Sequence, residues 1–119
     1  MSEIRLGAVE SKFADIIWNN EPLRPVELEK LAEAELNWKR TTTLTILKRL
    51  CERGIFQNKD RIITSLISRE EFYALQSEKF VNDTFEGSLP AFLTAFGSRK
   101  KLSDKEVEEL KKMIDSMRR

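Results

Sequence analysis

The stretch that decides the fold of this chain is Trp38-Lys-Arg-Thr-Thr-Thr-Leu-Thr-Ile-Leu-Lys-Arg-Leu-Cys-Glu-Arg-Gly54. As a helix it places one set of side chains at the i, i+3, i+4, i+7, i+8 spacing of a buried stripe, namely Thr43, Ile46, Leu47, Leu50 and Cys51. Gly54 stands where a residue that ends a helix takes positive φ. The stretch therefore predicts an amphipathic helix with a defined end.

The opposite face of this predicted helix is rich in hydroxyl and basic groups. It carries Thr41, Thr42, Thr45, Lys48 and Arg49, with Glu52 as its acid. Phosphate oxygens and base edges accept hydrogen bonds from hydroxyl, ammonium and guanidinium groups. The face therefore predicts a contact with DNA, and the alternative is a helix face that is merely solvated.

The distribution of charge favours the DNA interpretation. Between residues 39 and 61 there are seven lysines and arginines against two acids, a local charge of +5, whereas the whole chain carries +1. A basic patch on an otherwise acidic chain attracts a polyanion at one surface only.

The segments around this stretch predict a mainly α, winged helix-turn-helix domain over residues 1–67. Two helices precede it: one in residues 1–20 with a stripe of Val9, Phe13, Ile16 and Ile17, and one from Pro25 to about Glu35 with Val26, Leu28, Leu31 and Ala32. Two β-branched or aromatic runs follow it, residues 55–58 and 62–66, and they flank a tight turn at Lys59-Asp60-Arg61. Three helices and a two-stranded wing would place the third helix in the major groove and Lys59 and Arg61 near phosphates or the minor groove.

Residues 68–119 predict a helical dimerisation region. Ser68 with Glu71, and Ser103 with Glu106, have the spacing of capping boxes that begin helices, and residues 97–101 read as a loop after a short apolar helix, residues 89–96. About fifty residues with three amphipathic helices cannot fold alone, so a second copy would cover their apolar faces. The residues expected in that interface are Phe72, Phe80, Phe85, Phe92, Phe96, Val107, Leu110 and Ile114. The alternative is that these helices fold back on the winged domain of the same chain.

The composition argues against catalysis, metal binding and membrane insertion. Histidine is absent, and the single cysteine, Cys51, lies on the predicted apolar stripe and has no partner in the chain. There is no Gly-rich phosphate loop and no catalytic motif, so we expect neither an enzyme nor a cofactor. The sequence has no apolar run of about 18 residues and no secretory leader, which predicts a cytoplasmic protein.

The whole chain, from residue 5 to residue 116, resembles the penicillinase-repressor family of bacterial transcription regulators, which includes the β-lactamase, methicillin-resistance and copper-operon repressors. The order and spacing of several short motifs carry the resemblance. They are Glu10 and Ile17-Trp18; Val26 to Leu31; Trp38 with Thr42, Thr45, Leu47, Arg49-Leu50 and Gly54; Ser68-Arg-Glu-Glu-Phe72; Phe85-Glu-Gly-Ser88; and Leu102-Ser-x-x-Glu106-x-x-x-Leu110.

The resemblance implies a homodimeric repressor that binds palindromic operators in double-stranded DNA. It assigns the operator contacts to Lys39, Arg40, Thr41, Thr42 and Thr45, with Arg49 toward the backbone. Leu44 departs from the polar or basic residue common in the family, and we interpret it as an apolar contact to a thymine methyl group. The copper-sensing members carry Cys-x-Cys motifs that this chain lacks, so metal sensing by that route is not expected.

The resemblance also suggests how repression could end. The β-lactam-responsive members are inactivated by a protease that cuts before a phenylalanine aligned with Phe96, which makes Ala95-Phe96 the corresponding bond. Ala95 departs from the asparagine usual at that position. Two alternatives remain for the regulation and the function: a small-molecule effector bound at the dimer interface, and a protein-interaction module that keeps the winged fold without binding DNA.

Overall fold

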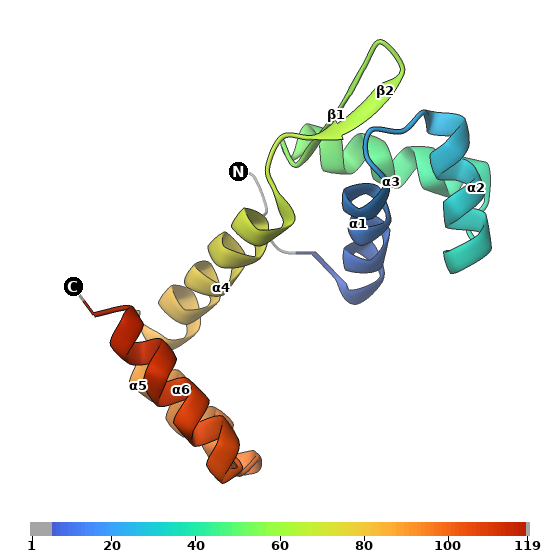
Figure 1. Cartoon of the computed structure of the whole chain (residues 1–119). Coiled ribbons are helices and arrows are strands. Elements are labelled where there is room, and N and C mark those ends of the chain that lie inside the picture. The colour runs from blue at the N-terminus through green and yellow to red at the C-terminus, as the bar shows by residue number, and fades with distance from the viewer. Residues whose placement is uncertain (1–5, 119) are drawn as a thin grey trace. The chain divides into compact units, whose positions relative to one another are not determined.

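The computed structural model describes residues 6–118 of the chain, and within them it contains six helices and one two-stranded antiparallel sheet (Figure 1). In chain order the elements are α1 (Ala8–Asn20), α2 (Pro25–Leu36), α3 (Arg40–Glu52), β1 (Phe56–Lys59), β2 (Ile62–Ser65), α4 (Arg69–Phe85), α5 (Leu89–Arg99) and α6 (Asp104–Ser116). The predicted order of three helices, a hairpin and further helices is confirmed.

The chain forms two compact units, residues 1–77 and residues 78–119, so that α4 contributes to both. We call the first the winged unit and the second the C-terminal unit. The winged unit holds the hydrophobic core, in which Phe13, Ile17, Leu28, Leu50 and Phe56 are fully buried. Three helices and a hairpin converge on these side chains, which fixes the face that each helix turns to solvent.

Two residues expected on the buried stripes are exposed instead. Val9 and Val26 are 52% and 53% exposed, because each lies in the first turn of its helix, beyond the core that the later residues fill. Leu6, which the periodicity does not include, is buried and joins the core from the segment before α1.

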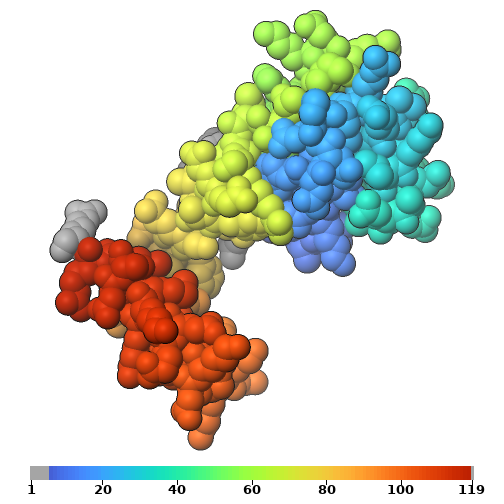
Figure 2. Space-filling view, in the orientation of Figure 1, coloured from blue at the N-terminus to red at the C-terminus, as the bar shows by residue number. Residues whose placement is uncertain are grey.

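The hairpin has a two-residue turn, shorter than the sequence suggests. Lys59 pairs with Ile62 at the end of the sheet, and Asp60 and Arg61 form the turn with φ of 54° and 63°. Positive φ at both central residues is the pattern of a type I′ turn, whose twist matches that of the flanking strands. This hairpin is the wing, which projects from the rest of the winged unit (Figure 2).

The base of the wing is held by the segment between α1 and α2. Leu23 forms a two-way backbone bridge with Ile63, through N···O distances of 3.3 and 2.8 Å. The carboxylate of Glu21 accepts hydrogen bonds from the Ser65 N–H (2.7 Å) and hydroxyl (2.9 Å). The wing therefore has a fixed position relative to the start of α2.

The first half of α4 belongs to the winged unit. Trp18 lies with its ring centroid 5.6 Å from that of Phe72, and its indole N–H donates to the Ile67 carbonyl oxygen at 3.1 Å. Arg69 forms an ion pair with Asp15 of α1 at 3.1 Å. Phe72 is only 1% exposed, so its expected place among the dimerisation residues is wrong: it fills the core of its own chain because the Trp18 ring lies beside it.

The helix ends follow the predicted capping signals, with one exception. The Ser103 hydroxyl accepts from the Glu106 N–H at 3.1 Å, and Glu106 accepts in return from the Ser103 N–H at 3.1 Å. The predicted loop at residues 97–101 is wrong in part, since α5 continues to Arg99. Gly97 is tolerated there, and the Ser98 hydroxyl donates to the Ala95 carbonyl oxygen, a bond compatible with a helix.

Candidate nucleic-acid interface

The rotation of α3 is set by three fully or nearly fully buried side chains. Thr43, Leu47 and Leu50 are at most 4% exposed, and the Thr43 hydroxyl is satisfied by the Lys39 carbonyl oxygen at 3.1 Å. Ile46 and Cys51 pack at the edge of the same core. Because one face is fixed in this way, the opposite face must point to solvent.

Most of the side chains expected to contact DNA lie on that solvent face, and Lys39 and Arg40 lie at the start of the helix. All of the following are exposed: Lys39, Arg40, Thr41, Thr42, Thr45, Lys48 and Arg49. Leu44 is half-buried at the border of the face. The first turn of α3 contains no acid, and no side chain caps its start. Its free N–H groups and positive dipole end add to the charge of Lys39 and Arg40.

Two ion pairs join α3 to its neighbours. Arg40 Nε lies 3.2 Å from Glu29 Oε1 of α2, and Arg49 Nη1 lies 3.5 Å from Glu10 Oε2 of α1. In both pairs the carboxylate is the less exposed partner. The sequence interpretation gives neither acid a role at this interface, yet they orient two of the cations and offset part of their charge.

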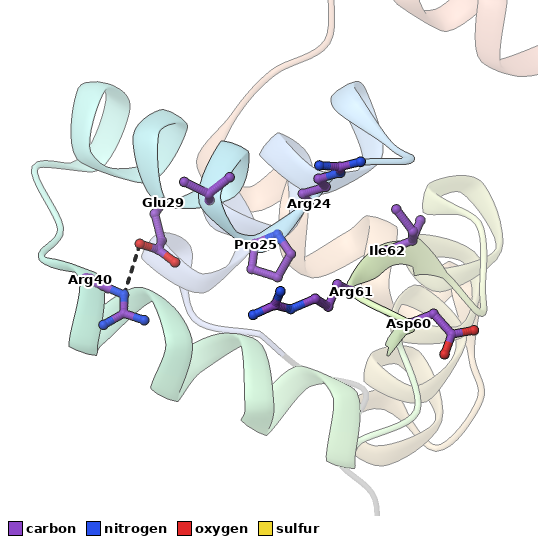
Figure 3. A pocket seen from close by; sticks show the side chains of 8 residues that line it. Arg24, Pro25, Glu29, Arg40, Asp60, Arg61 and Ile62 are labelled. Carbon is purple, nitrogen blue, oxygen red and sulfur yellow. Dashed lines mark ion pairs between the residues drawn. The ribbon is translucent and has the colours of Figure 1, made fainter.

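The wing supplies further cations. Lys59 and Arg61 are exposed. Arg61 also lines a hollow of about 590 Å³ together with Arg40 and Arg24, so residues of the wing, α3 and the start of α2 border the same hollow (Figure 3). The sequence interpretation misses Arg24. The sequence places Arg24 at the start of a helix, because Pro25 follows it at the first helical position. Its position near the wing depends on the pairing of Leu23 with Ile63, which the sequence does not reveal.

The predicted dimerisation residues other than Phe72 lie in the C-terminal unit or at its boundary. Phe80, Phe85 and Phe92 form an edge-to-face cluster with ring centroids 5.7–6.2 Å apart. Val107 and Leu110 are half-buried, whereas Phe96 and Ile114 are 45% and 49% exposed in the single chain. Ala95, also exposed, precedes Phe96 within α5.

The rest of the described chain offers few other chemical sites. Across residues 6–118 there is no group of three or more Cys, Asp or Glu side chains arranged to hold a metal ion. No helix in that part of the chain has both the length and the apolar character needed to cross a membrane. Burial raises the pKa of the Cys51 thiol, and the neighbouring Glu52 carboxylate raises it further.

A three-helix core with a β wing, whose third helix presents a cationic and hydroxyl-rich face, defines a winged-helix DNA-binding regulator. The chain belongs to the penicillinase repressor family, whose model matches residues 6–116.

Relatives and a solved structure agree with this assignment. The methicillin resistance regulatory protein MecI of Staphylococcus aureus strain Mu50 is 25% identical over 114 residues, which cover 92% of this chain and 93% of that protein. The penicillinase repressor of Bacillus licheniformis is 22% identical over 115 residues, 93% of this chain and 90% of that protein. The solution structure of Bacillus licheniformis BlaI, monomeric and in complex with the blaP half-operator, matches with a TM-score of 0.50 and 22% identity. That match covers 60% of this chain and 93% of the BlaI chain and supports the winged-helix fold.

Proposed function

We propose that this chain is a homodimeric repressor that binds palindromic operators in the cytoplasm and is released from them by proteolysis. The observation that carries the proposal is the exposed face of α3 beside the wing, where hydroxyls and cations gather at a helix start that has no acid. The similar BlaI protein has been solved in complex with a half-operator, which supports DNA as the partner.

The face divides into groups suited to bases and groups suited to phosphates. Thr41, Thr42 and Thr45 have short hydroxyls that can reach base edges from a helix in the major groove, and Leu44 at the border suits a thymine methyl group. The longer cations suit the phosphate backbone, which positions the protein without reading sequence. They are Lys39, Arg40, Lys48 and Arg49 of the α3 segment and Lys59 and Arg61 of the wing.

Dimerisation is supported by apolar side chains that remain exposed in the single chain. Phe80, Phe96, Met113 and Ile114 are each at least 40% exposed, and Met117 is 70% exposed. Exposed apolar groups on successive helices of a small unit favour association with a second copy. A two-fold axis would place two α3 helices about one DNA turn apart, or a small multiple of it.

Proteolysis between Ala95 and Phe96 would divide the C-terminal unit. The bond lies inside α5, so the helix must unfold locally before a protease can bind this segment as an extended substrate. Cleavage would separate α6 and the end of α5 from the winged unit. The two copies would then bind DNA independently and lose the advantage of bivalency. Incubation with the cognate protease, followed by mass spectrometry, tests this step, and an intact Ala95-Phe96 bond after derepression would refute it.

The central experiment is a salt series of binding to the DNA upstream of the protein's own gene and to a scrambled duplex, with the mass of the free protein measured in parallel. We expect a dimer that prefers its upstream DNA, and a double variant with Arg40→Ala and Thr42→Ala that folds and dimerises but loses this preference. Equal, weak and steeply salt-dependent binding to both duplexes would refute the repressor proposal and favour a protein-interaction module.

A further inference from the structure

The hollow beside the wing is formed by three separate elements of the winged unit. Its lining comes from the start of α2 (Arg24, Pro25, Val26, Glu29), the first residue of α3 (Arg40) and the wing turn (Asp60, Arg61, Ile62). Its volume is about 590 Å³, and Figure 3 shows the Arg61 side chain extending from the wing turn toward Pro25 and α3. Three arginines, Arg24, Arg40 and Arg61, thus line one open hollow.

The charges of the hollow are not balanced by its acids. Glu29 is engaged with Arg40 through the 3.2 Å contact, and in Figure 3 the Asp60 carboxylate points away from the Arg61 guanidinium. Arg24 and Arg61 are exposed, and Figure 3 marks no ion pair between either of them and Glu29 or Asp60. The hollow therefore keeps a positive charge that an anion can neutralise.

The wing turn holds Arg61 in a conformation that its residue type does not favour. Asp60 and Arg61 both have positive φ, 54° and 63°, where hairpin turns usually carry Asn-Gly. A non-glycine residue in the left-handed region is strained, and such strain concentrates at functional sites. An arginine at this position directs a cation into the hollow, where a glycine would give an easier turn without one.

Glu29 and Arg40 differ in how freely they can change partners. The Glu29 side chain is 20% exposed and the Arg40 side chain 74% exposed, so the carboxylate is the fixed member and the guanidinium the accessible one. A guanidinium carries five N–H donors, and the observed contact uses only its Nε. Arg40 can therefore turn toward an incoming anion, but Glu29 competes with that anion for its charge.

We propose that the hollow is the binding site of one DNA backbone phosphate, which Arg24, Arg40 and Arg61 hold. Glu29 weakens DNA binding because it competes with the phosphate for Arg40. The inference rests on the proposed DNA-binding function and adds Arg24 and Glu29 to its interface. A phosphodiester fits better than a free small anion because the hollow lies between the start of α3 and the wing turn, the two elements that flank a bound duplex in this class. Because phosphates carry no sequence information, Glu29 lowers the affinity for every duplex alike.

The test compares Glu29→Gln with Glu35→Gln, which removes the same charge from an exposed site on α2 that does not line the hollow. In the full-length protein we expect Glu29→Gln to bind both the upstream and the scrambled duplex about two- to fivefold more tightly, the range of an exposed ion pair. Glu35→Gln should match the wild type. In an Arg40→Ala background the gain from Glu29→Gln should vanish, since the two side chains act as a pair.

A second variant tests whether the hollow binds a phosphate. Arg24→Ala should weaken binding to both duplexes and reduce the slope of log affinity against log salt by about 0.9, the value for one lost phosphate contact. Circular dichroism of each variant confirms its folding. The inference is overturned if Glu29→Gln binds no more tightly than Glu35→Gln, if its gain persists without Arg40, or if Arg24→Ala leaves the slope unchanged.

The same data separate the two proposals. If the wild type does not prefer its upstream DNA, the proposed function fails, whatever the variants do. If the wild type prefers its upstream DNA while Glu29→Gln and Arg24→Ala behave as the wild type, the repressor function stands and only the phosphate-binding site is refuted.

Discussion

Replacing Phe72 with alanine should destabilise the winged unit rather than dissociate a dimer. The Phe72 ring is 1% exposed and has its centroid 5.6 Å from the rings of both Trp18 and Tyr73. Removing a buried phenyl group costs about 3–5 kcal/mol through lost burial and the cavity left behind. A domain of this size has a free energy of unfolding of about 5–15 kcal/mol, so the variant should lose a large part of its stability.

The two tryptophans make this measurable for the winged unit alone, since Trp18 and Trp38 both belong to it. Urea unfolding followed by tryptophan fluorescence should give the 3–5 kcal/mol loss expected for a buried phenyl group, which is roughly a 12 °C fall in Tm or more. Phe80→Ala is the matched control, because Phe80 lies on the same helix and is 40% exposed. It should leave the fluorescence transition nearly unchanged and weaken self-association.

The reasoning would be refuted by a loss of less than about 1 kcal/mol in Phe72→Ala, well below the range for a buried phenyl group. It would equally fail if Phe80→Ala shifted the tryptophan transition as much as Phe72→Ala does.

Other measurements test the remaining surfaces. Lys48→Ala should weaken binding to all duplexes alike and flatten the salt dependence by about one unit, whereas an unchanged slope would remove Lys48 from the interface. Leu110→Asp should raise the dimer dissociation constant by about 100-fold or more, measured by analytical ultracentrifugation, because it places a charge in the proposed interface. Cys51 should alkylate more slowly than a free thiol at neutral pH, because burial raises its pKa, and a rate equal to that of a model thiol would contradict this. Hydrogen bonds from Ser103 lower the pKa of Glu106, so the stability they add to α6 is present above the ordinary glutamate pKa and lost as pH falls through the lowered value. On acidification, circular dichroism should show a smaller loss of helix in Ser103→Ala than in the wild type.

The sequence by itself determined the elements and the face of α3. The spacing of Thr43, Leu47 and Leu50 is a local property of the chain, so the buried side of α3 and its exposed cationic side both follow from periodicity. Capping at Ser103 and the positive φ of Gly54 are equally local, since each depends on residues within one helical turn.

Only the tertiary structure decided which of these residues meet. Phe72 has the same apolar character as Phe80, and only the position of Trp18 makes one a core residue and leaves the other exposed. The pairing of Leu23 with Ile63 brings Arg24 to the wing, and α2 places Glu29 against Arg40. Periodicity reports the face of a helix on which a side chain lies. It carries no information about the side chain that another element brings opposite, because that depends on how distant segments pack.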